Sequence, residues 1–161
     1  NDILNIPLLK LKLQEVVIPV FYIENKQFGY TIMDGQFCSI MPKGKEQNMF
    51  LLYHVNFSVL NSFEGYFIPA DWTLNRNIEH EINIIYKEST KYYPFLKYCK
   101  KISYYHTFRA IPINNDDERE TTIFKNTYNN KQVYTILSGK ITTANYIANT
   151  IKNEIIKEAQ L

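Results

Sequence analysis

With 161 residues the chain is long enough to bury the core of one domain, and its 45% apolar and 21% charged residues exclude a disordered or collagen-like protein. A net charge of +2 is too small to indicate nucleic-acid or membrane binding by itself, and no apolar stretch approaches the roughly 20 residues of a membrane span. Cys38 and Cys99 lie far apart, without metal-ligand or disulfide-framework spacing, which predicts reduced structural thiols in a cytoplasmic protein.

The first third of the chain has the alternation and turn signals of antiparallel strands. Leucine and lysine alternate from Leu9, almost at the first residue, so we expect the chain to be the C-terminal part of a longer protein. Asp34-Gly35 predicts a hairpin, and Pro42–Lys45 predicts a second turn. The strands predicted around these turns are Leu9–Leu13, Val16–Ile23, Phe28–Met33, Phe37–Met41 and Met49–Val55.

A helix is predicted in the middle of the chain, after a loop through Gly65 and Pro69. Asn75 is expected to cap this helix, which covers about residues 76–90 and ends before Pro94. Three isoleucines at helical spacing predict one buried face: Ile78, Ile82 and Ile85. The next predicted elements are a strand at Ile102–Ile111 and a polar loop at Asn114–Glu120.

The last segment passes directly from a strand into a helix. A β-branched run, Val133–Leu137, ends at Ser138-Gly139-Lys140, and an amphipathic helix follows. Free backbone N–H groups, the helix dipole and the Lys140 ammonium would meet at this turn, which suits a ligand with an anionic or carbonyl oxygen. Ile147, Ile151 and Ile155 are expected to lie on one face of this helix.

These elements predict an α+β fold, with a mostly antiparallel sheet, one helix packed on it, and a C-terminal helix after a strand-glycine turn. Residues 1–132 are expected to form the sheet domain, and residues 133–161 the C-terminal strand and helix.

Arg109 is the strongest candidate for binding a small ligand. It lies among apolar neighbours in a predicted strand, where an unpaired guanidinium is costly to bury. Its partner is either a substrate carboxylate, bound through two parallel hydrogen bonds, or a structural salt bridge to Asp34 or Glu15. His54, which follows Tyr53, is a candidate general base or substrate contact, although histidines in strands are more often half-buried and bonded to backbone.

Other polar residues are expected to be structural. His80 and His106 belong to this group, and because the three histidines lack metal-ligand spacing, no metal site is predicted. The acidic run Asp116–Glu120 resembles a cation site only superficially. Because it lacks a glycine at the turn and the spacing of an EF-hand, we expect a solvated loop there. Lysines and aromatic residues interleave over Lys87–Phe108, either as a surface that stacks single-stranded nucleic acid or as tyrosines facing the core and lysines facing water.

Four short blocks of sequence carry a more specific pattern. They are Met33–Pro42, Phe50–Val55, Phe108–Pro112 with Asp116–Arg119, and Leu137–Thr143. In this order the blocks resemble the C-terminal half of FAD-dependent oxidoreductases of the D-amino-acid oxidase superfamily, over most of the chain. The chain departs from the family by lacking its Gly-x-Gly-x-x-Gly fingerprint, and by carrying Gln36 and Glu120 where prolines are expected.

The resemblance implies a role for each candidate. The antiparallel strands would form the substrate domain above the flavin, with Arg109 anchoring a substrate carboxylate and with Tyr53 and His54 bordering the cavity. Backbone N–H groups at the start of the last helix would stabilise negative charge at flavin N1 and C2=O. The residues implied in this cofactor contact are Ser138, Gly139, Lys140, Ile141 and Thr142.

The function implied is oxidation of an amine or amino acid by hydride transfer to flavin N5. Because the fingerprint is missing, the chain would depend on an N-terminal FAD-binding half, would not hold FAD tightly alone, and would be inactive as it stands. Its partners would be that half and a small-molecule substrate, with no membrane and no nucleic acid. The alternative is a free-standing, non-catalytic α+β module that binds a small ligand or single-stranded nucleic acid.

Overall fold

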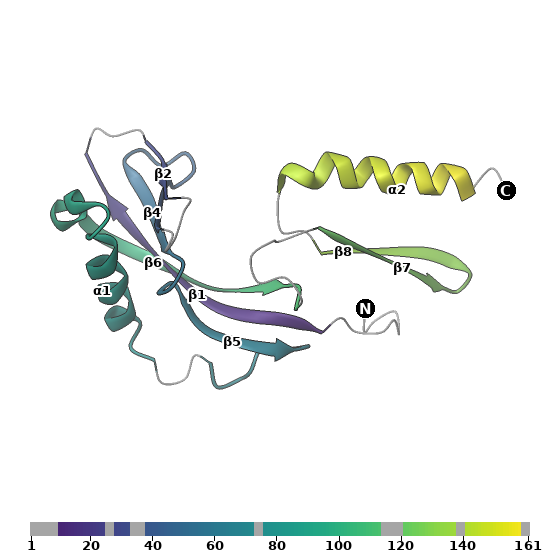
Figure 1. Ribbon diagram of the computed structural model, residues 1–161, viewed down its shortest axis with the longest axis horizontal. Coiled ribbons are helices and arrows are strands. Elements are labelled where there is room, and N and C mark those ends of the chain that lie inside the picture. Colours follow the sequence, from purple (N-terminus) through teal and green to yellow (C-terminus); the bar gives the residue numbers. More distant parts are fainter. Residues whose placement is uncertain are drawn as a thin grey trace. The chain divides into compact units, whose positions relative to one another are not determined.

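The computed structural model describes residues 10–24, 28–32, 38–72, 76–113, 121–137 and 141–158. These residues form an α+β fold with mostly antiparallel strands and two α-helices, one of them C-terminal, which confirms the predicted fold class (Figure 1). The chain divides into two compact units. The larger contains Leu13–Phe63 and Ile68–Arg109, and the smaller contains Asn1–Lys12, Glu64–Phe67 and Ala110–Leu161.

A long strand, β1 (Leu11–Tyr22), is central to the main sheet. Two strands were predicted over this stretch, but the chain continues through Pro19 as one. β1 pairs with β4, antiparallel and with Val20 opposite Leu51, and also with β5 and β6. The sheet has the order β2-β3-β4-β1-β5, with β6 also on β1. Its other strands are β2 (Tyr30–Thr31), β3 (Cys38–Pro42), β4 (Met49–His54), β5 (Val59–Gly65) and β6 (Lys100–Ile111).

The core lies between one face of this sheet and helix α1 (Ile78–Ser89). Side chains alternate along each strand, so the opposed pair Phe21 and Phe50 faces α1, while Val20 and Leu51 lie on the other face. The rings of Phe21 and Phe50 stack with their centroids 5.7 Å apart. The buried core residues are Val17, Phe21, Cys38, Ile40, Phe50, Leu52, Ile82, Ile85, Tyr86 and Leu96.

The start of α1 differs from the prediction. The N-cap is Asn77, whose side-chain oxygen accepts a hydrogen bond from the backbone N–H of His80 at 3.2 Å. The predicted cap, Asn75, lies outside the described residues. After α1, a short 3₁₀ helix begins at Pro94 and covers Pro94–Tyr98, in agreement with the predicted helix stop.

Strand β5 replaces part of the predicted loop through Gly65, and the loop prediction is wrong for Val59–Gly65. A tight turn after β4 starts this strand, because the backbone N–H groups of Phe57 and Ser58 both donate to the His54 carbonyl. The N–H of Val17 then donates to the carbonyl of Ser58 at 2.9 Å, which holds the turn against β1.

The smaller unit contains a hairpin of β7 (Thr122–Tyr128) and β8 (Lys131–Leu137) and a helix, α2 (Ala144–Glu158). Strand β7 was not predicted, and the predicted domain boundary at 132/133 falls within this hairpin. Lys125 of β7 pairs with Glu154 and Glu158, which holds α2 beside the hairpin. Ile147 is buried and Ile151 half-buried, whereas Ile155, near the C-terminal end of the same helix, is 51% exposed.

Candidate functional site

Arg109 lies on the sheet face opposite α1, together with Tyr53 of β4 and Gln14 of β1. Its Nε donates to Oε1 of Gln14 at 2.7 Å, and its Nη2 donates to Oη of Tyr53 at 3.1 Å. The guanidinium carbon is 5.7 Å from the Tyr53 ring centroid, within reach of a cation–π interaction. Three strands therefore fix the orientation of this guanidinium.

The hydrogen-bond partners of Arg109 among the described residues are neutral. No carboxylate of the described residues is in ion-pair distance of Arg109, and Nη1 makes no hydrogen bond to a described residue. Of the two acidic residues considered as its salt-bridge partner, Glu15 binds other groups, and Asp34 lies outside the described residues. The arrangement leaves guanidinium donors for an oxygen-bearing ligand.

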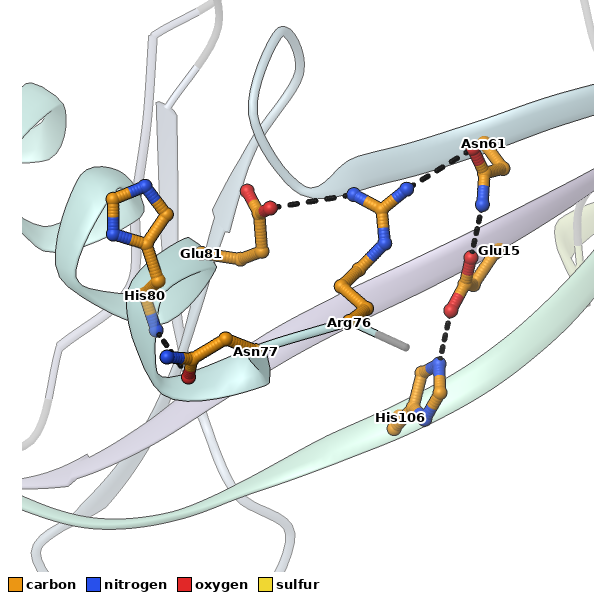
Figure 2. Close-up of polar contacts among 7 residues, drawn as sticks. All are labelled: Glu15, Asn61, Arg76, Asn77, His80, Glu81 and His106. Atoms are coloured by element: carbon orange, nitrogen blue, oxygen red, sulfur yellow. Dashed lines mark hydrogen bonds and ion pairs between the residues drawn. The ribbon is translucent and has the colours of Figure 1, made fainter. Parts of the chain in front are cut away.

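A second polar cluster surrounds Glu15, whose side chain is fully buried on the α1 side of the sheet (Figure 2). Its Oε1 lies 2.7 Å from Nε2 of His106 on β6, and its Oε2 accepts a hydrogen bond from Nδ2 of Asn61 on β5 at 2.6 Å. A buried carboxylate is costly without such partners, and here each of its two oxygens has one polar partner. His106 is 23% exposed, so the cluster reaches the surface there.

The cluster continues from Asn61 to the start of α1. Nη2 of Arg76 donates to Oδ1 of Asn61 at 3.1 Å, and Nη1 of Arg76 lies 3.3 Å from Oε1 of Glu81 in the first turn of the helix. Figure 2 shows this chain of contacts running from His106 on β6 through Glu15 and Asn61 to Arg76 and Glu81. It connects three strands to the helix, and that role is structural.

His54 does not join Arg109. As the residue after Tyr53 in β4, it points to the other face of the sheet, where its side chain is buried against Phe57 and Tyr92 with ring centroids 4.7 and 5.9 Å away. The N–H of Asn56 donates to Nδ1 at 3.3 Å, so the neutral ring carries its proton on Nε2. Burial lowers the pKa of His54 below its ordinary value. The charges of Glu88, which raises this pKa, and of Lys91, which lowers it, have smaller effects. These contacts match the structural interpretation of His54.

Most of the predicted cofactor contact lies outside the described residues, because Ser138, Gly139 and Lys140 are not among them. The backbone of Ile141–Thr143 forms a 3₁₀ turn that leads into α2 at Ala144, and the side chain of Thr142 is exposed. In general, N–H groups in the first turn of a helix have no acceptor within the helix, and they can bind a carbonyl oxygen.

The sequence contains a signal for the second cluster, in two adjacent polar residues of β1. Gln14 and Glu15 directly precede the apolar run Val16–Phe21 of β1, and each binds one side chain of β6 on its own face of the sheet. His106 was classed as structural, but its carboxylate partner was not identified. Among the described residues, no group of three or more histidine, cysteine, aspartate or glutamate side chains is arranged to hold a metal ion.

The chain matches no protein-family model and no curated protein. Within the part of the chain that the structure describes, no helix combines the length and apolar character needed to cross a membrane.

Proposed function

We propose that this chain is the substrate-facing, C-terminal part of a cytoplasmic FAD-dependent oxidoreductase that oxidises an amine or an amino acid. The observation that carries the proposal is the Arg109 guanidinium, held by Gln14 and Tyr53 with no carboxylate among the described residues to neutralise it. The four sequence blocks that resemble the D-amino-acid oxidase superfamily support it independently. The unpaired state of Cys38 and Cys99 is in accord with a reducing compartment.

Arg109 would bind the carboxylate of the substrate through its free guanidinium edge. Gln14 and Tyr53 would act as positioning residues, since their contacts at 2.7 and 3.1 Å fix the plane of the guanidinium before the substrate arrives. Bound FAD would supply the hydride acceptor, N5. The backbone N–H groups of the Ile141–Thr143 turn would face the pyrimidine end of that ring.

The proposal predicts that the complete protein, purified, has flavin absorbance and that this chain alone binds FAD weakly. Arg109→Ala should raise KM for an amino-acid substrate by about 100-fold, equivalent to about 2.7 kcal/mol, because a charged carboxylate contact is lost. Its melting temperature should change little. Steady-state kinetics and thermal melting of the complete protein measure the two quantities.

Arg76→Ala is the matched control, because Arg76 is also half-buried but binds Asn61 and Glu81 on the opposite face. It should lower the melting temperature and leave KM unchanged. The absence of flavin absorbance and of FAD binding in the complete protein would remove the proposal. A loss of stability in Arg109→Ala as large as its loss of substrate binding would make Arg109 structural.

A further inference from the structure

The geometry of β6 points to an interaction that the proposed function does not use. We propose that β6 is a docking edge for an extended, acidic segment of a partner protein, which pairs with the strand and inserts a large apolar side chain into the hollow at its start. The evidence is an open strand edge, exposed apolar side chains, an aromatic hollow and a set of lysines.

The edge of β6 that faces away from β1 is long and has no paired strand among the described residues. Among the described residues this strand pairs with β1 alone, although it extends over Lys100–Ile111. Several of its large side chains are partly exposed, with Ile102 43%, Tyr104 41% and Tyr105 47% exposed. Proteins usually cover or shorten such an edge, because its free N–H and C=O groups pair readily with another chain.

These exposures also decide an earlier alternative. Tyr98 is 90% exposed, so the interpretation in which the tyrosines of this stretch face the core is wrong for Tyr98, Tyr104 and Tyr105.

A hollow of about 490 Å³ opens at the start of β6. Lys100, the first residue of the strand, lines it together with Tyr98, so the hollow adjoins the start of β6. Its wall includes the Phe28 ring, which packs against Tyr30 and Phe95 with centroids 4.7 and 5.8 Å away. An aromatic hollow of this size suits an apolar side chain, which would act as the anchor of a docked segment.

The charges around this edge select the partner. Lys97, Lys100 and Lys101 lie close together, and the stretch from Lys97 to Ile111 contains no aspartate or glutamate. None of the three lysines forms an ion pair with a carboxylate of the described residues. The Nζ of Lys101 instead contacts α1, where it donates to Oδ1 of Asn83 and lies 4.6 Å from the ring centroid of Tyr86, so Lys97 and Lys100 are the lysines left for a partner. Glu24 also lines the hollow, so the cationic character is strongest along the strand. A second copy of β6 would bring like charges together, whereas an acidic strand is complementary.

The open edge favours a polypeptide over a nucleic acid. Interleaved lysines and tyrosines can stack bases, but a nucleic acid has no backbone N–H and C=O ladder to match the edge of a strand. An extended peptide uses both the backbone edge and the hollow.

The test is fluorescence anisotropy with the whole chain and a fluorescein-labelled peptide of alternating glutamate and valine around one phenylalanine. We expect saturable binding that Tyr98→Ala and Lys100→Glu each weaken at least about tenfold. Tyr146→Ala and Lys152→Glu, which change an exposed tyrosine and an exposed lysine of α2, are the matched controls and should bind as the parent does. Circular dichroism melting establishes that each variant folds, and Lys100→Ala replaces Lys100→Glu if the latter does not.

The same measurement contains the outcomes that would overturn the proposal. One is the absence of saturable binding, and another is equal affinity for a peptide with lysine in place of each glutamate. Binding of an oligothymidylate without binding of the acidic peptide would assign the surface to nucleic acid instead. None of these outcomes depends on flavin, so the proposed function is tested separately.

Discussion

Replacing His106 with alanine should destabilise the larger unit because it removes one of the two partners of a buried carboxylate. Nε2 of His106 lies 2.7 Å from Oε1 of Glu15, which has no exposed surface. A hydrogen bond to a charged group contributes about 1.5–3 kcal/mol. The His106 side chain is 23% exposed, so water would enter and offset part of the loss. We therefore expect the free energy of unfolding to fall by about 2 kcal/mol in His106→Ala.

A double-mutant cycle with Glu15→Gln separates this contact from general packing. Glutamine keeps the shape of the side chain, can accept the bond from Asn61, and can donate to the other tautomer of His106, so Glu15→Gln should cost less than about 1 kcal/mol. In that background His106→Ala should cost about 1 kcal/mol, which gives a coupling energy of about 1 kcal/mol.

The assay is urea unfolding followed by far-ultraviolet circular dichroism and by the fluorescence of Trp72. His80→Ala is the control, since this side chain is exposed on α1, and its effect should stay within about 0.5 kcal/mol. Equal costs of His106→Ala in the two backgrounds, or a cost no larger than that of His80→Ala, would refute the reasoning.

Three further predictions concern buried titratable groups. Tyr86→Phe should raise the free energy of unfolding by about 1 kcal/mol, because the buried hydroxyl has no hydrogen-bond partner among the described residues. Burial also raises the pKa of Tyr86, so above about pH 10 the unfolded state releases the hydroxyl proton and the folded state keeps it. The free energy of unfolding should therefore fall as pH rises, and it should fall less steeply in Tyr86→Phe; urea unfolding at several pH values measures both. Burial lowers the pKa of His54, so below about pH 6.5 the unfolded state binds a proton that the folded state does not, and stability should fall as pH falls. An NMR titration should show that His54 in the folded chain is protonated only below the ordinary pKa of histidine, and protonation at the ordinary pKa would contradict this. Cys38 has no exposed surface, and burial raises the pKa of its thiol. At pH 8 an aromatic disulfide reagent should therefore label Cys38 only as fast as the chain unfolds, and rapid labelling of Cys38 in the folded chain would contradict this.

The sequence predicted the parts of the fold in which a local pattern agrees with burial. Alternation along β4 and helical spacing in α1 both appear in the structure, because one face of each element packs into the core. β5 carries asparagine, serine and glycine and has no such pattern. It forms a strand because the turn at His54–Ser58 directs the chain along β1, and this depends on contacts between distant residues.

The β7–β8 hairpin had a local signal that was overlooked. Asn129 and Asn130 both have positive φ, 48° and 59°, as a two-residue hairpin turn requires. Asparagine is the residue other than glycine that most readily adopts this conformation. The Asn-Asn pair between two β-branched runs was therefore sufficient to predict the hairpin, including strand β7.

The candidate site was predictable only in part. A single arginine in an apolar strand indicated that Arg109 needs a partner, but its contacts come from β1 and β4, which lie far away in sequence. Tyr53 and His54 are neighbours in sequence and were grouped together, yet strand geometry sends them to opposite faces. The pairing of three strands decides whether Tyr53 or His54 lies on the same side of the sheet as Arg109. Sequence spacing does not specify that pairing.

Gln14 and Glu15 allow only one register between β1 and β6. Each binds a different side chain of β6, Arg109 on one face and His106 on the other. Sliding β1 by one residue would exchange the two faces, so that Gln14 would lie on the face of His106 and the Glu15 carboxylate on the face of the Arg109 guanidinium. A register error of one residue would thus bring a carboxylate to the face of the Arg109 guanidinium and neutralise its charge. The Gln14-Glu15 dipeptide therefore determines both the strand register and whether Arg109 keeps neutral partners.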